Sequence, residues 1–236
     1  MRDVFLVAAG VLMISGAARA ADVAADGGYA KSPAFAAPER YDLSTIELTW
    51  DNGQRRWSVA WFTGSDTWVG NDFDTSTLKT SPYAKILKYK YYTRGAWPNR
   101  RWDGIRLAFY DFSGGVPGSM LWPTSGTPYF FKPNNPDIQS HIWVELDINW
   151  RCPKSEFLAA QEQFYNYPVC DAFSLDDSTT FEGHTWERFK GSWRPFSEQE
   201  NLGPYRNAMI RVWVEPSKSA PAVAPCSIGR VKALYY

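Results

Sequence analysis

The chain has no excess of charge of either sign, because its 25 Lys and Arg residues are balanced by 25 Asp and Glu residues. Nucleic acids and anionic membranes attract proteins through clustered positive charge. A neutral chain gives no basis for expecting either of them as a partner, so no nucleic-acid partner is predicted.

Long hydrophobic runs are absent after the first 20 residues, so no transmembrane helix is expected. The single apolar run, residues 4–14, has the length of a signal-peptide core, and the small-x-small motif ARA that follows it ends at Ala20. The sequence therefore predicts a signal peptide that is cleaved near Ala20, and a protein that is secreted, periplasmic or on the cell surface.

Cysteine is scarce, with three residues in the chain. Cys152 and Cys170 each lie beside a Pro-containing turn, and in an oxidising compartment we expect a disulfide between them. The alternative is two reduced thiols in the core. Cys226 is then the odd cysteine, available for a disulfide to a partner.

Motifs of hydrolases and metalloenzymes are lacking: there is no G-x-S-x-G, no H-E-x-x-H and no metal-ligand spacing around His141 or His184. Glu145, Asp147 and Glu162 are carboxylates of the kind that glycosidases use in pairs, but solvent-facing positions on half-buried strands explain them more simply. No catalytic residue is therefore predicted.

One glycine-rich stretch, FYDFSGGVPGSMLW (109–122), raises the question of a phosphate-binding loop. Such a loop places its N–H groups at the start of a helix, whereas Pro123 ends any helix here after one turn. Gly114-Gly115 and Pro117-Gly118 are typical of two consecutive turns, so we expect a corner between two strands.

Aromatic residues and two-residue alternation are abundant instead: Phe, Trp and Tyr make up 17% of the chain. Apolar side chains alternate with polar ones over 46–50, 57–61, 87–91, 105–109, 142–150 and 208–214, with turn residues between these runs. This pattern predicts an all-β fold, an antiparallel β-sandwich of the jelly-roll or Ig-like kind. Only KSEFLAAQEQF (154–164) suits a helix as well as a strand.

The expected organisation is a signal peptide (1–20), a flexible leader (21–40), the β-sandwich (41–215), a Pro/Ala-rich linker (216–227) and a β-like segment (228–236).

The stretch LAFYDFSGGVPGSMLW resembles the strand–loop–strand pattern of jelly-roll or Ig-like β-sandwich modules in secreted bacterial proteins, in which Tyr-Asp leads through Gly-x-Pro-Gly to a Leu. ELTWDNG, ILKYKYY, NAMIRVWVE and GRVKALYY are similar to flanking segments of these modules, so the resemblance covers 41–236. It implies a β-sandwich with an exported, accessory role, and it brings no catalytic residues with it.

The loop TRGAWPNRRWDG is the predicted ligand-binding site. Trp97 and Trp102 flank Arg100 and Arg101, and Pro98 makes a helix improbable, so the rings are expected on a loop between strands. Flat rings beside guanidinium groups suit stacking on a sugar with hydrogen bonds to its hydroxyls or a carboxylate. The simpler interpretation is that one Trp caps the end of the sandwich.

The segment GSDTWVGNDFDTS is the predicted calcium site. It brings Asp66, Asn71, Asp72 and Asp74 into nine positions, and extracellular β-sandwiches bind Ca²⁺ with oxygen-rich turns of this kind. CDAFSLDDSTT, with its three aspartates, is a comparable alternative. The simpler interpretation, which the pattern favours, is that these residues form Asx-turns.

Taken as a sequence, the chain is best explained as an exported, non-catalytic binding module for a glycan or another surface polymer. A structural or assembly role in the envelope or surface layer is the alternative, suggested by Cys226 and by the β-like end. A polysaccharide or peptide hydrolase comes third.

Overall fold

The structure of the protein, a computed structural model, describes residues 11–15, 45–76, 78, 83–177, 182–198 and 207–217. Its regular structure is antiparallel β-sheet, with one short 3-10 helix, η1 (Phe196–Glu198). The prediction of an all-β sandwich is confirmed. None of the described helical structure is long and apolar enough to cross a membrane.

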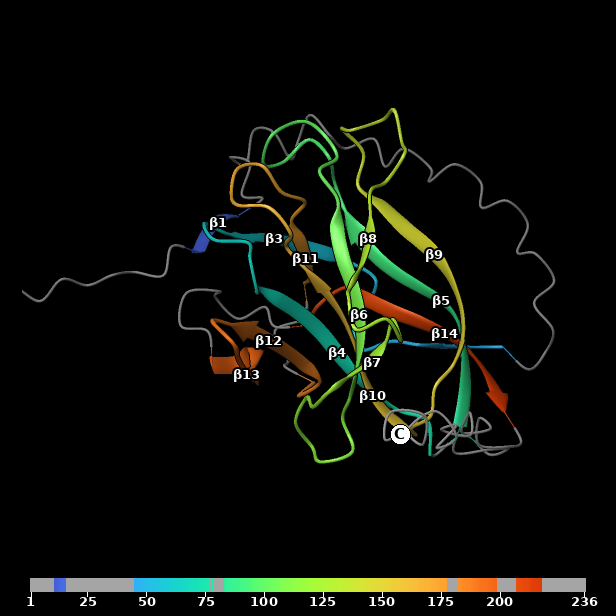
Figure 1. Ribbon diagram of the computed structural model, residues 1–236. Coiled ribbons are helices and arrows are strands. Elements are labelled where there is room, and N and C mark those ends of the chain that lie inside the picture. Colours follow the sequence, from blue (N-terminus) through green and yellow to red (C-terminus); the bar gives the residue numbers. More distant parts are fainter. Residues whose placement is uncertain are drawn as a thin grey trace, which may run out of the picture.

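The first layer of the sandwich is a seven-stranded sheet with the order β13-β12-β4-β10-β6-β7, in which β8 also pairs with β6 (Figure 1). Its strands are β4 (Trp68–Asp74), β6 (Ile105–Asp111), β7 (Met120–Trp122), β8 (Tyr129–Phe131), β10 (Glu156–Glu162), β12 (Thr185–Phe189) and β13 (Ser192–Pro195).

The second layer combines two smaller sheets. One has the order β2-β14-β5-β9 and the other β1-β3-β11. Their strands are β2 (Ile46–Leu48), β5 (Tyr83–Thr93), β9 (Ile142–Arg151) and β14 (Ile210–Ser217), then β1 (Val11–Ser15), β3 (Arg55–Trp61) and β11 (Phe173–Asp176). A bridge between Leu175 and Ala208 joins the two sheets, so they continue one another behind the first layer.

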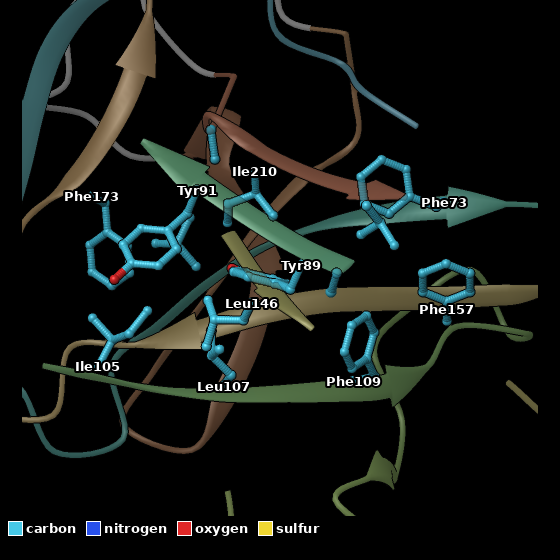
Figure 2. Packing of buried hydrophobic residues seen from close by; sticks show 14 of the residues in the cluster. Phe73, Tyr89, Tyr91, Ile105, Leu107, Phe109, Leu146, Phe157, Phe173 and Ile210 are labelled. Carbon is cyan, nitrogen blue, oxygen red and sulfur yellow. The ribbon is translucent and has the colours of Figure 1, made fainter. Parts of the chain in front are cut away.

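The hydrophobic core fills the space between the two layers (Figure 2). Ile105, Leu107 and Phe109 point from β6 toward Tyr89 and Tyr91 of β5, and all five side chains are fully buried. The alternation seen in the sequence puts these residues on one face of their strands. Burial of these large apolar side chains is the main stabilisation of the fold.

The segment KSEFLAAQEQF forms β10, the central strand between β4 and β6. Phe157 and Ala159 face the core, whereas Leu158 and Ala160 face the outer side of the sheet and belong to a second apolar cluster. Because both of its faces are buried, β10 carries nearly continuous apolar residues and its period is weak. The strand alternative is therefore the correct one.

The stretch 112–119 is a corner between β6 and β7, as predicted. Gly118 N–H donates to the Asp111 carbonyl at 2.7 Å, and Gly115 N–H donates to the Phe112 carbonyl at 2.9 Å. Gly115 has φ +71°, a left-handed conformation that glycine adopts without strain. The glycines therefore serve the turn geometry.

The predicted disulfide between Cys152 and Cys170 is not present, because both residues are free, buried thiols. Cys152 precedes β10 and belongs to the main core, whereas Cys170 follows β10 and packs beside Ala60 and Ala172. The seven residues of β10 between them, at about 3.3 Å each, place the two cysteines near opposite ends of the sheet. Cys226 lies outside the described residues.

We expect both buried thiols to be unreactive in the folded protein. Burial raises the pKa of Cys152 and of Cys170 to about 12, so almost no thiolate, the nucleophilic form, exists at neutral pH. Iodoacetamide followed by peptide mass mapping should label neither residue before denaturation and both after it. A Cys152–Cys170 peptide in the unreduced digest would contradict the free-thiol assignment.

Candidate functional site

Several loops meet at one end of the sandwich, the upper end in Figure 1, which we call the loop end. Strand register puts them there: Thr93 at the end of β5 pairs with Ile142 at the start of β9. Likewise Ile105 at the start of β6 pairs with Phe131 at the end of β8. The loops 94–104 and 132–141 therefore lie side by side at the loop end, and the loop 163–172, which follows β10, joins them.

A pocket of about 390 Å³ opens between the first two of these loops. We call it the loop-end pocket. Three of the four residues predicted for ligand binding line it, together with a basic and amide-rich segment from the facing loop. The lining residues are Arg100, Arg101, Trp102, Lys132, Pro133, Asn134, Asn135, Pro136 and Ile138.

The two tryptophans of the predicted platform hold the loops in place. Trp102 is 6% exposed, and its indole N–H donates to the Asn135 carbonyl at 2.8 Å, so it joins the two walls of the pocket. Trp97 is half-buried, with its ring centroid 6.3 Å from that of Tyr167. Neither ring is a free stacking surface, and the cationic side chains are the exposed part of the site.

Positive charge dominates the pocket. Arg100, Arg101 and Lys132 are exposed, and Arg101 Nε donates to Asp103 Oδ1 at 2.6 Å. Neither Arg100 nor Lys132 makes a salt bridge with any carboxylate of the described residues. Lys132 attracts the buried Asp171 carboxylate at longer range. Two exposed cations that make no salt bridge, beside the amides of Asn134 and Asn135, suit an anionic ligand.

A buried carboxyl group, Asp171, holds the base of the pocket loop. Its two oxygens accept the N–H groups of Asp103 and Gly104, each at 2.9 Å. Gly104 has φ +98°, and a Cβ there would lie 2.7 Å from the Phe130 ring, so only glycine fits. Burial raises the pKa of Asp171 to about 6; the Asp103 carboxylate adds to this rise, and the two N–H donors oppose it.

An aromatic patch adjoins the pocket. It consists of Phe130, Phe164 and Tyr165, of which two are among the most exposed large apolar side chains, at 44% for Phe130 and 39% for Tyr165. Phe130 and Phe164 make an edge-to-face contact at 5.4 Å, and the Arg106 guanidinium lies 3.8 Å from the Phe164 ring centroid. Exposed aromatic rings beside cations indicate an interaction surface.

The residues predicted to bind calcium do not form one cluster. Asn71, Asp72 and Asp74 lie on β4, a strand rather than a turn, and Asp66 lies in the turn before it. Asn71 points into the core, where it donates to the carbonyls of Ala208 and Ile210, so it faces away from Asp72. The described residues include no group of three or more His, Cys, Asp or Glu residues that could hold a metal ion.

A histidine–aspartate pair lies on the outer face of the same strand. His184 Nδ1 is 2.8 Å from Asp72 Oδ2, the His184 ring stacks on Trp50 at 3.6 Å, and Trp186 Nε1 donates to Asp72 Oδ1 at 2.8 Å. Burial raises the pKa of Asp72, and the hydrogen bonds from His184 and Trp186 oppose the rise. Sequence spacing did not reveal this pair, because its members are separated by 112 positions.

The pair has two of the three parts of a nucleophile-activating triad. Among the described residues no hydroxyl or thiol is hydrogen-bonded to His184. Glu162, the strand carboxylate considered above, is buried, and its oxygens already accept from Asp66 N–H and from Arg106. These contacts give the His184–Asp72 pair and Glu162 structural roles. The loop-end pocket is therefore the stronger candidate site.

Comparison of the chain with protein-family models, with curated proteins and with solved structures gives no match.

Proposed function

We propose that the protein is an exported β-sandwich module that binds an anionic glycan, or another acidic surface polymer, at the loop end. The observation that carries this proposal is the pair of exposed cations, Arg100 and Lys132, which line the pocket and make no salt bridge with the described residues. The signal-peptide pattern and the resemblance to modules of secreted bacterial proteins support export.

A glycan fits this end of the molecule better than a simple anion does. A pocket of about 390 Å³ has room for a sugar unit. Arg100 and Lys132 can bind its carboxylate or sulfate, the Asn134 amide its hydroxyls, and the adjoining rings of Phe130 and Tyr165 offer apolar surface to the next sugar along the chain. No proton transfer is required, and the module acts by binding alone.

Calorimetric titration of the mature protein, residues 21–236, with acidic and neutral oligosaccharides tests this proposal. We expect oligouronate or sulfated oligosaccharide to bind, and neutral oligoglucose to bind weakly or not at all. Arg100→Ala and Lys132→Ala should each raise the Kd by roughly 10- to 100-fold, because a hydrogen bond to a charged group contributes roughly 1.5–3 kcal/mol.

Arg151→Ala is the matched control. Arg151 is exposed like Arg100 but ends β9 at the opposite end of the molecule from the pocket, so its loss should leave the Kd unchanged. Equal weakening by all three substitutions would indicate nonspecific charge attraction and overturn the assigned site. Absence of binding to every acidic oligosaccharide would overturn the proposed ligand.

A further inference from the structure

The edge of β3 carries an inference independent of the loop-end pocket. β3 lies between β11 and β1, and β1 (Val11–Ser15) pairs with it through five residues, from Val11↔Trp61 to Ser15↔Trp57. Every residue of β1 belongs to the predicted signal peptide. Removal of that peptide on export takes away the strand that covers this edge.

The pairing of β3 with β11 shows which backbone N–H and C=O groups of β3 lose their hydrogen-bond partners when β1 is removed. The Ser174 carbonyl of β11 accepts Met209 N–H, so the backbone groups of Ser174 point away from β3. Backbone groups alternate in direction along a strand, so those of Phe173 point toward β3, and its partner Val59 bonds to β11. Ser58 and Ala60 therefore direct their N–H and C=O groups toward β1.

The free edge of β3 is better suited to pairing with another strand than to facing solvent. The register Leu12↔Ala60 and Ile14↔Ser58 shows that the edge accepts a strand of this chain, VLMIS, which is apolar in sequence. Natural proteins seldom leave a hydrophobic edge strand open, because its unpaired groups recruit other chains. A replacement strand would satisfy these backbone groups once the signal peptide is gone.

We infer that the C-terminal segment 228–236 (IGRVKALYY) adds to the β3 edge of its own chain in the exported protein. The segment alternates Val231, Ala233 and Tyr235, which is the pattern of a strand with one apolar face. The ten residues 218–227 between β14 and this segment span up to about 35 Å when extended. The inference rests on the proposed export and signal-peptide removal, and it does not depend on ligand binding.

Residue-resolved amide hydrogen exchange by NMR tests this inference on the mature chain, residues 21–236, and on a variant truncated after Ser217. In the mature chain the amides of Ser58 and Ala60 should exchange slowly. In the truncated variant they should exchange at least about 100-fold faster, because their hydrogen bonds open to solvent. Trp57 and Val59, which bond to β11, are the internal control and should stay protected in both proteins.

Two further measurements keep the outcome unambiguous. Ala233→Pro in the full mature chain removes one strand N–H and should deprotect Ser58 and Ala60 as the truncation does, even if the truncated chain folds poorly. Rapid exchange of Ser58 and Ala60 in the mature chain, equal protection in all variants, or protection that depends on protein concentration would overturn the inference. Mass spectrometry of the exported protein tests signal-peptide removal separately, and titration of the truncated variant with acidic oligosaccharide tests the proposed function separately.

Discussion

Asp171 should contribute a fall of about 2–3 kcal/mol to the free energy of unfolding as the pH rises from 4 to 7. Half-buried His141, whose pKa is lowered by burial to about 3, contributes a change of opposite sign over this range, so the Asp171 contribution must be isolated. Burial raises the pKa of this carboxyl from an ordinary value of 3.8 to about 6 in the folded protein. Between these two values the folded state binds more protons than the unfolded state, so stability decreases with rising pH. The contribution is fully present below about pH 4 and is lost as the pH passes through about 6.

Asp171→Asn isolates this contribution, since an amide of the same shape does not titrate. The stability of the wild type minus that of the variant should fall by about 2–3 kcal/mol between pH 4 and pH 7, measured as urea midpoints at several pH values. At pH 4 the variant should be less stable than the wild type by about 1–3 kcal/mol, because its NH₂ group cannot accept the second of the N–H groups of Asp103 and Gly104. An unchanged slope would show that Asp171 is not the titrating group.

Phe109→Ala should destabilise the fold by about 3–5 kcal/mol. The Phe109 ring is fully buried in the core, where Figure 2 shows it beside Tyr89 and Phe157. Its centroid lies within 6.2 Å of the ring centroids of Tyr89, Trp122, Trp150 and Phe157. These neighbours come from β5, β7, β9 and β10, so truncation leaves a cavity where both layers meet and neither can close it alone.

Thermal unfolding followed by near-ultraviolet circular dichroism measures the effect, and a decrease of roughly 10 °C in Tm is expected. Val116→Ala provides the control, because Val116 is 57% exposed at the tip of the corner after β6 and its truncation removes no core contact. Equal melting temperatures for Phe109→Ala and the wild type would contradict the placement of Phe109 between the layers.

The sequence predicts the fold well where one face of a strand is buried and the other is solvated. β9 shows this best, because Val144 and Leu146 are buried while Glu145 and Asp147 are exposed. The two-residue period is therefore visible in the amino-acid sequence. Prediction is weaker for β10, which has both faces buried and therefore lacks a polar face.

β4 shows why a polar residue in the sequence does not always indicate an exposed position. Asn71 is polar yet fully buried, because the carbonyls of Ala208 and Ile210 and the Thr185 hydroxyl satisfy its amide. Such partners lie more than 100 positions away, so composition alone suggests an exposed turn. The cysteine prediction failed for a related reason, since proximity in sequence says little once a whole strand runs between two residues.

The sequence indicated where the arginine cations of the candidate site lie, but not that Trp102 is buried. Arg100 and Arg101 line the pocket, as a loop rich in Arg and Trp suggests, and Lys132 joins them from a loop that carried no signal of its own. Trp102 is buried because its N–H finds the Asn135 carbonyl across the pocket. Only tertiary structure decides which end of such an amphipathic side chain meets water.

Chemical-shift mapping tests the loop-end binding site most directly. Acidic oligosaccharide is titrated into ¹⁵N-labelled mature protein, and the amide shifts are followed residue by residue. Binding at the loop end predicts saturable shifts concentrated in 100–102 and 132–138, extending to the aromatic patch around Phe130 and Tyr165 and decreasing with added salt. Saturable shifts centred instead on Trp50 and His184, or no shifts with any acidic oligosaccharide, would contradict it.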